Sequence, residues 1–119
     1  MSYGLEFEVG GGGGPPVGTY TAVLESVDAT EHPEYGPGLR FGWRIIEGQC
    51  AGVLASRTTN RSPSPANISG RLMAGLLGRQ IKSGERVAIG GCIGRRYMIV
   101  VGLGANGTST RVESCMPIS

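Results

Sequence analysis

The stretch Leu39-Arg-Phe-Gly-Trp-Arg-Ile45 decides the fold class, because large apolar residues alternate in it with arginine and glycine. A period of two places the four large apolar side chains on one face of a β-strand, and Arg40 and Arg44 on the other. The opposite orientation would bury two unpaired guanidinium groups, which is costly. We therefore expect both aromatic rings and Ile45 in a core, and both arginines in solvent.

A second alternating stretch follows over residues 53–61, where Val53 and Ala55 share their parity with Arg57, Thr59 and Arg61. We interpret it as a strand that pairs with the first one as a hairpin. In that pairing four arginines are expected to share one exposed sheet face: Arg40, Arg44, Arg57 and Arg61. Such a face is suited to a polyanion.

Charge is distributed unevenly along the chain. Residues 1–39 hold six acidic residues and no Lys or Arg, whereas residues 40–119 hold eleven basic and three acidic residues, a net charge of +8 within a formal total of +2. Ten of the eleven cations are arginine, whose planar fork matches phosphate and stacks on bases. The alternative is that scattered arginines only solvate a small domain, because a pI near 8.6 is modest for a nucleic-acid binder.

A chain of 119 residues with 22 glycines predicts one domain with many tight turns between short strands. Five consecutive glycines at residues 10–14 are followed by two prolines, a composition typical of a linker. We therefore divide the chain into an N-terminal segment, residues 1–17, and a domain, residues 18–119. Residues 3–9 alternate in a way that is also compatible with an added strand.

The cysteines and the single histidine exclude some classes of site. Cys50, Cys92 and Cys115 are odd in number and widely spaced, so neither a disulfide framework nor a zinc site is expected. No signal peptide or membrane-spanning run is apparent, which favours a cytoplasmic protein with no membrane partner. We expect no metal and no cofactor.

The expected elements run strand, strand, strand, helix, strand, strand. The helix is predicted over residues 65–77, with Ser64 as its N-cap and Gly78 as its left-handed end. Short apolar runs at residues 87–89 and 95–103 are interpreted as strands, and Asn106-Gly107 predicts a hairpin turn into a last strand. This order is that of the oligonucleotide/oligosaccharide-binding (OB) fold, a mainly β, five-stranded Greek-key barrel with a helix between strands three and four. An SH3-like barrel is the nearest competitor, but its helix is usually shorter.

Several turn and core segments resemble those of small OB-fold, single-stranded-DNA-binding-like proteins of phage or mobile-element origin, most of them without an assigned function. These segments lie within residues 18–117 and include Gly18-Thr-Tyr-Thr-Ala-Val-Leu, Tyr35-Gly-Pro-Gly-Leu-Arg-Phe, Leu76-Leu-Gly-Arg-Gln80 and Gly94-Arg-Arg-Tyr-Met-Ile-Val100. The resemblance implies an OB barrel and single-stranded DNA as a ligand.

Catalytic motifs are weak. Residues 102–107 spell G-x-G-x-x-G, but the segment that follows is predicted as a strand, whereas a dinucleotide site needs a helix there. His32 is the only imidazole and lies in a turn that contains prolines and acidic residues, where a solvated side chain is the simpler interpretation. We expect no enzyme.

The sequence thus predicts a non-enzymatic protein that binds single-stranded DNA through an arginine-lined sheet face. The candidate binding residues are Arg40, Arg44, Arg57, Arg61, Arg95 and Arg96, with Tyr97 and Tyr35 as rings on which bases stack. The alternative is a protein-interaction module of a phage or mobile element that does not bind nucleic acid. DNA versus RNA, the protein partner and formation of a homo-oligomer stay open at this stage.

Overall fold

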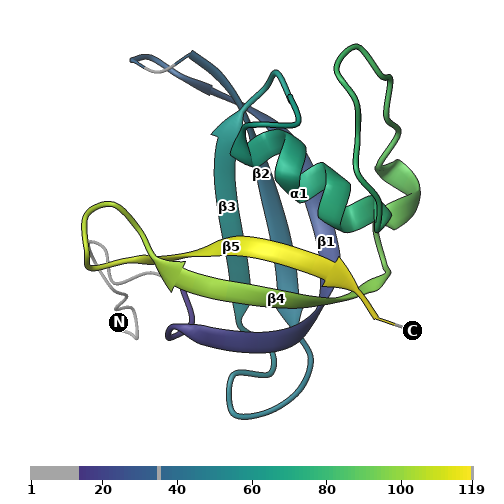
Figure 1. Ribbon diagram of the computed structural model, residues 1–119. Helices are drawn as coiled ribbons and strands as arrows, with labels where there is room; N and C mark the ends of the chain where they lie inside the picture. Colours follow the sequence, from purple (N-terminus) through teal and green to yellow (C-terminus); the bar gives the residue numbers. More distant parts are fainter. Residues whose placement is uncertain (1–13, 35, 119) are drawn as a thin grey trace.

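The computed structural model describes residues 14–34 and 36–118. Five strands and one α-helix follow the chain in the expected order: β1 (Gly18–His32), β2 (Gly36–Ile45), β3 (Leu54–Asn60), α1 (Ile68–Leu77), β4 (Arg96–Leu103) and β5 (Thr110–Pro117), with a short 3-10 turn, η1 (Gly90–Cys92), before β4. The described chain is therefore mainly β, as predicted (Figure 1).

All strand pairs are antiparallel, and the sheet order is β3-β2-β1-β4-β5. The strands thus form one sheet, with β3 and β5 at its two ends. Among the described residues no backbone ladder joins β3 to β5, so the sheet is not closed into a barrel by hydrogen bonds along the strands. Arg57 on β3 nevertheless reaches across this seam and donates to the carbonyl oxygen of Val112 on β5 at 3.0 Å.

The alternation over residues 39–45 is confirmed. Phe41, Trp43 and Ile45 are all 0% exposed, whereas Arg40 is exposed and Arg44 is partly exposed. The rings of Phe41 and Trp43 stack with centroids 5.9 Å apart. Burial of these large side chains on one side of the sheet supplies the main apolar contribution to folding.

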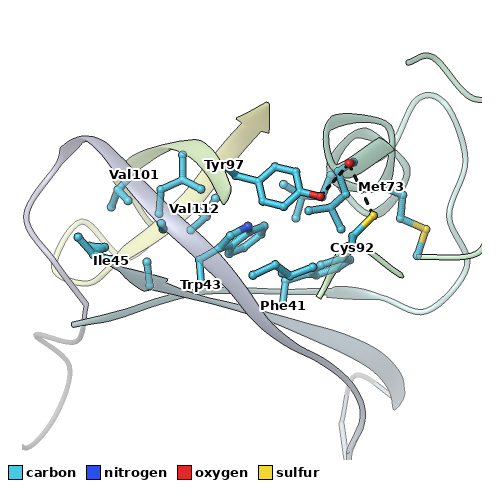
Figure 2. Packing of buried hydrophobic residues seen from close by; sticks show 14 residues of the cluster. Phe41, Trp43, Ile45, Met73, Cys92, Tyr97, Val101 and Val112 are labelled. Carbon is cyan, nitrogen blue, oxygen red and sulfur yellow. Dashed lines mark hydrogen bonds between the residues drawn. The ribbon is translucent and has the colours of Figure 1, made fainter. Parts of the chain in front are cut away.

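Helix α1 covers the core beside β5. Its apolar face buries Leu72, Met73 and Leu76, and the core cluster around it includes Tyr97 and Cys92 (Figure 2). Tyr97 donates its hydroxyl hydrogen to the carbonyl oxygen of Leu76 at 2.9 Å, which ties β4 to the last turn of the helix.

The helix begins three residues later than predicted. Asn67, and not Ser64, is its N-cap, because the Asn67 Oδ1 atom accepts from the backbone N–H of Gly70 at 2.8 Å. The same oxygen also accepts from the backbone N–H of Ser64, which fixes the preceding turn. The end at Gly78 is confirmed, with a left-handed φ of 73°.

The strand expected over residues 87–89 is wrong. These residues have no ladder partner, and η1 follows them directly. Val87 and Ile89 are apolar because they pack against the core, and not because they alternate across a sheet. An apolar run of this length does not distinguish a strand from an irregular segment that packs on the core.

The described end of the predicted linker contacts the domain. Pro15 is buried and its carbonyl oxygen accepts from the Thr110 hydroxyl at 2.5 Å, while that of Pro16 accepts from the Tyr20 hydroxyl at 2.6 Å. Pro15 and Pro16 therefore fasten this segment to the sheet. The remainder of the predicted segment, including the conceivable strand over residues 3–9, lies outside the described residues.

Candidate nucleic-acid interface

The outer face of the sheet, which is the face turned away from the core, carries Arg40 and Arg44 on β2. The cross-strand neighbours of Arg40 are Asp28 on β1 and Thr58 on β3. Although Asp28 lies directly opposite, Arg40 forms no ion pair or hydrogen bond with it or with any other side chain that the structure describes. Its guanidinium group is therefore available to an anion.

Arg44 is held by partners within the protein. Its Nη2 and Nε atoms donate to the two carboxylate oxygens of Glu25 at 2.7 and 3.1 Å, and Nη1 donates to the carbonyl oxygen of Gly52 at 3.1 Å. The hydrogen bond to Arg44 lowers the pKa of Glu25, and the same bond raises the pKa of Arg44. Both groups are thus ionised at neutral pH.

Arg57 does not lie on this face, so the expectation of four arginines side by side is wrong. Its cross-strand partner on β2 is Phe41, and residues directly opposite in an antiparallel pair point to the same side of the sheet. Arg57 therefore starts on the core side and extends to the seam, where Glu113 lies 3.5 Å away. Its side chain is 11% exposed, and burial lowers its pKa. The register of the hairpin formed by β2 and β3 sets this position of Arg57.

Arg61 lies beyond the end of β3 and is also occupied. Its Nη2 atom donates to the carbonyl oxygen of Thr30 at 2.7 Å and to the carboxylate of Glu31 at 3.1 Å. These bonds fasten the chain after β3 to the end of β1. Arg61 consequently forms no continuous row with Arg40 and Arg44 on the strands.

Arg96 extends the outer face to the other side of β1, whereas Arg95 lies directly before β4 and has the parity of buried Tyr97. Arg96 is the first residue of β4, and its cross-strand neighbour on β1 is Val23. Val23 is also the neighbour of Arg44 on β2. The three residues thus form a row across three strands, with Val23 in the middle, and exposed Arg95 precedes Arg96 in the chain. The sequence predicted both arginines as contacts, but the row depends on the pairing of β1 with β2 and β4, which has no local signal in the sequence.

The expected aromatic platforms are not on this face. Tyr97 is 0% exposed and points into the core, so it offers no ring face to a base, and that assignment is corrected. Tyr35 is not among the described residues. Tyr20 is partly buried and bonded to Pro16. Within residues 14–34 and 36–118, no Phe, Tyr or Trp ring is exposed on the outer face.

Apolar side chains occupy the neighbouring part of the outer face. Met98 on β4 and Met116 on β5 are cross-strand partners and are 37% and 53% exposed, and Val100 lies two residues along β4. We call these three residues the methionine patch. It adjoins Arg96 along β4.

Other chemistry-bearing side chains form no metal-binding cluster in the part of the chain that the structure describes. No group of three or more His, Cys, Asp or Glu residues gathers there in a way that would hold a metal ion. Burial raises the pKa of the Cys115 thiol to about 12, which leaves it unreactive at neutral pH. The Nδ1 atom of His32 accepts from the backbone N–H of Glu34 in an exposed turn.

Comparison with protein-family models, with curated proteins and with solved structures gave no match. As for membranes, none of the helices within the described ranges is both long and apolar enough to cross a bilayer. The geometry of the sheet and its arginines is therefore the basis for inferring a function.

Proposed function

We propose that this protein is a non-enzymatic, cytoplasmic OB-type protein that binds single-stranded DNA weakly and without sequence preference across the outer face of its sheet. The contact residues are Arg40 and Arg44 on β2 together with Arg96 at the start of β4 and the exposed Arg95 directly before it. Arg57 is left out of this set because it starts on the core side of the sheet, and Arg61 because it lies beyond the end of β3.

The fold supports the proposal through its strand order. The order β3-β2-β1-β4-β5, with a helix between β3 and β4, is the connectivity of an OB barrel opened between β3 and β5. At that seam Arg57 joins the two strands by a side-chain bond in place of a ladder. The resemblance to phage and mobile-element proteins of the single-stranded-DNA-binding type is a second support.

One observation carries the proposal: Arg44 and Arg96 flank Val23 on the same face of three adjacent strands. Neighbouring strands lie about 4.8 Å apart, so the two arginine backbones are separated by about 10 Å, near one Debye length in physiological salt. Two guanidinium groups at this separation act together on a flexible polyanion. Val23 between them is partly buried and carries no charge.

The same face explains why binding is expected to be weak. The described outer face exposes no Phe, Tyr or Trp ring, whereas such rings contribute about 1–3 kcal/mol per stacked base. Glu25 and Asp28 also offset part of the positive charge. What remains is recognition of phosphate, which carries no sequence information.

Titration of a fluorescent oligothymidine with the full-length protein at a series of salt concentrations tests the proposal. Up to four phosphate contacts predict that log affinity falls with log salt with a slope of about −2 to −3, since each contact to a single strand contributes about 0.7. Binding without salt dependence, or no binding in low salt, would contradict it.

The methionine patch favours a second candidate, a protein-interaction module. Methionine and arginine are both enriched in protein interfaces, and the exposed pair Met98 and Met116 lies beside Arg96. Substitution of Met98 by Ser separates the candidates, because it would weaken a protein interface and leave the salt slope for DNA unchanged.

A further inference from the structure

Glu25 occupies an unusual position in β1. The pairing of β1 with β2 shifts between Leu24 and Ser26, so Glu25 is the additional residue of a β-bulge. Bulges change the direction in which a side chain points. Here the displaced carboxylate forms a bidentate pair with the guanidinium group of Arg44, with one hydrogen bond from each of two nitrogens.

This geometry is the one that a phosphate group adopts on arginine. A bidentate carboxylate and a bidentate phosphate use the same two N–H directions of the guanidinium fork. Arg44 therefore cannot keep both bonds to Glu25 while it makes the same contact with a DNA phosphate. The contrast with Arg40 is clear, since its opposite neighbour Asp28 leaves that guanidinium group free.

We propose that Glu25 is a built-in competitor of the DNA phosphate at Arg44. This inference rests on the proposed function and names the residue that limits its affinity. In the free protein Glu25 fills the phosphate position, and binding exchanges the carboxylate for a phosphate. The side chains of Arg44 and Glu25 are 41% and 46% exposed, so solvent and ligand both reach the pair. Exposed ion pairs are weak enough to be exchanged in this way.

The third bond of Arg44 supports the exchange. Its Nη1 atom donates to the carbonyl oxygen of Gly52, in the loop between β2 and β3, independently of Glu25. When the carboxylate leaves, this bond keeps the guanidinium group on the outer face. The arginine is then already oriented for its new partner, which reduces the entropic cost of binding.

The substitution Glu25→Gln tests the proposal in the full-length protein with the oligothymidine titration. We expect affinity in low salt to rise about two- to fivefold, the range that corresponds to the loss of one exposed ion pair, and the salt slope to stay near that of the wild type, because Arg44 contacts a phosphate in both complexes. Thermal unfolding of each variant establishes that the fold is kept.

A general charge effect is separated from the release of Arg44 by two further variants. Glu85→Gln removes the same charge and releases Arg79, which Glu85 holds at 2.7 Å in the segment after α1, and it should leave affinity nearly unchanged. In an Arg44→Ala background, Glu25→Gln should lose its gain, because the two residues act as one pair.

Five outcomes are informative. A gain in affinity that depends on Arg44 supports the proposal that Glu25 competes with phosphate. Binding that becomes detectable only in the Glu25→Gln protein supports it as well. If the wild type binds and Glu25→Gln has the same affinity, Glu25 is not a competitor. A gain in affinity that persists without Arg44 leads to the same conclusion. Both results leave the proposed function standing. No binding by any of the proteins overturns both.

Discussion

Arg57 on β3 donates a hydrogen bond to the main-chain oxygen of Val112 on β5 at 3.0 Å, across the seam where the sheet has no backbone ladder. The two residues are 55 positions apart in the chain, and Val112 is fully buried. A single side chain thus joins the two ends of the sheet. Glu113 lies beside it at 3.5 Å and balances its charge.

Removal of this link should cost stability. Arg57→Met keeps the length and the apolar stem but takes the donor from the Val112 carbonyl, and a buried carbonyl that loses its partner costs about 1–3 kcal/mol. Urea unfolding measures the loss. Arg111→Met, a change at a neighbouring and more exposed arginine, is the matched control and should cost less than about 0.5 kcal/mol. Equal losses would show that Arg57 is only a surface charge.

Trp43 should be the most sensitive core position of β2. Trp43→Ala removes a fully buried ring and should cost about 3–5 kcal/mol. The indole Nε1 atom is buried and has no hydrogen-bond partner among the described residues, so Trp43→Phe removes an unsatisfied donor together with part of the ring. We expect Trp43→Phe to cost about 1–2 kcal/mol in denaturant unfolding. A loss as large as that of the alanine variant would mean that the N–H has a partner.

Gly75 brings α1 against β5 more closely than any larger residue allows. A Cβ atom at this position would collide with the backbone carbonyl oxygen of Cys115, and it would lie 2.9 Å from the Cys115 sulfur. Gly75→Ala should therefore destabilise the protein by about 1–3 kcal/mol, although alanine favours a helix by about 1 kcal/mol. Gly91→Ala, in open space, serves as the control for thermal unfolding. A stabilised Gly75→Ala variant would contradict the close packing.

Truncation tests the domain boundary predicted from the sequence. Deletion of residues 1–13 should leave the unfolding midpoint unchanged, because the glycine run offers no side chains to bury. Deletion of residues 1–17 removes in addition the bonds of Pro15 with Thr110 and of Pro16 with Tyr20, and should lower the midpoint. Identical curves for both deletions would show that residues 14–17 contribute nothing. A lower midpoint for the shorter deletion would place a stabilising element within residues 1–13.

The revised set of contact arginines makes a distinct prediction for DNA. Arg40→Ala and Arg96→Ala together should reduce the magnitude of the salt slope by about 1.4, since each arginine accounts for about 0.7. Arg79→Ala with Arg86→Ala changes the same charge away from the outer face and should alter the slope little. If Arg57→Ala flattened the slope as much as Arg40→Ala does, the register argument for the site would be wrong.

The positions of the arginines could be predicted from the sequence within one strand but not between strands. Within one strand a period of two separates Arg40 and Arg44 from Trp43, and this separation was correct. Between strands the faces depend on the hairpin register, and Arg57 proved to lie opposite Phe41. Parity within the second strand gave no information on that register, because the length of the loop between the strands sets it.

The sequence by itself determined the local features of this protein: the alternation in β2, the left-handed end of α1 at Gly78 and the hairpin at Asn106-Gly107. Each of these depends on residues within one or two turns of the chain, whose backbone preferences are intrinsic. Only the tertiary structure decided that Glu25 forms an ion pair with Arg44 and that Tyr97 points inward to α1. It also decided that Arg44 and Arg96 flank Val23. These relationships depend on a bulge and on pairing between distant strands, which minimise free energy over the whole chain and leave no local signal in the sequence.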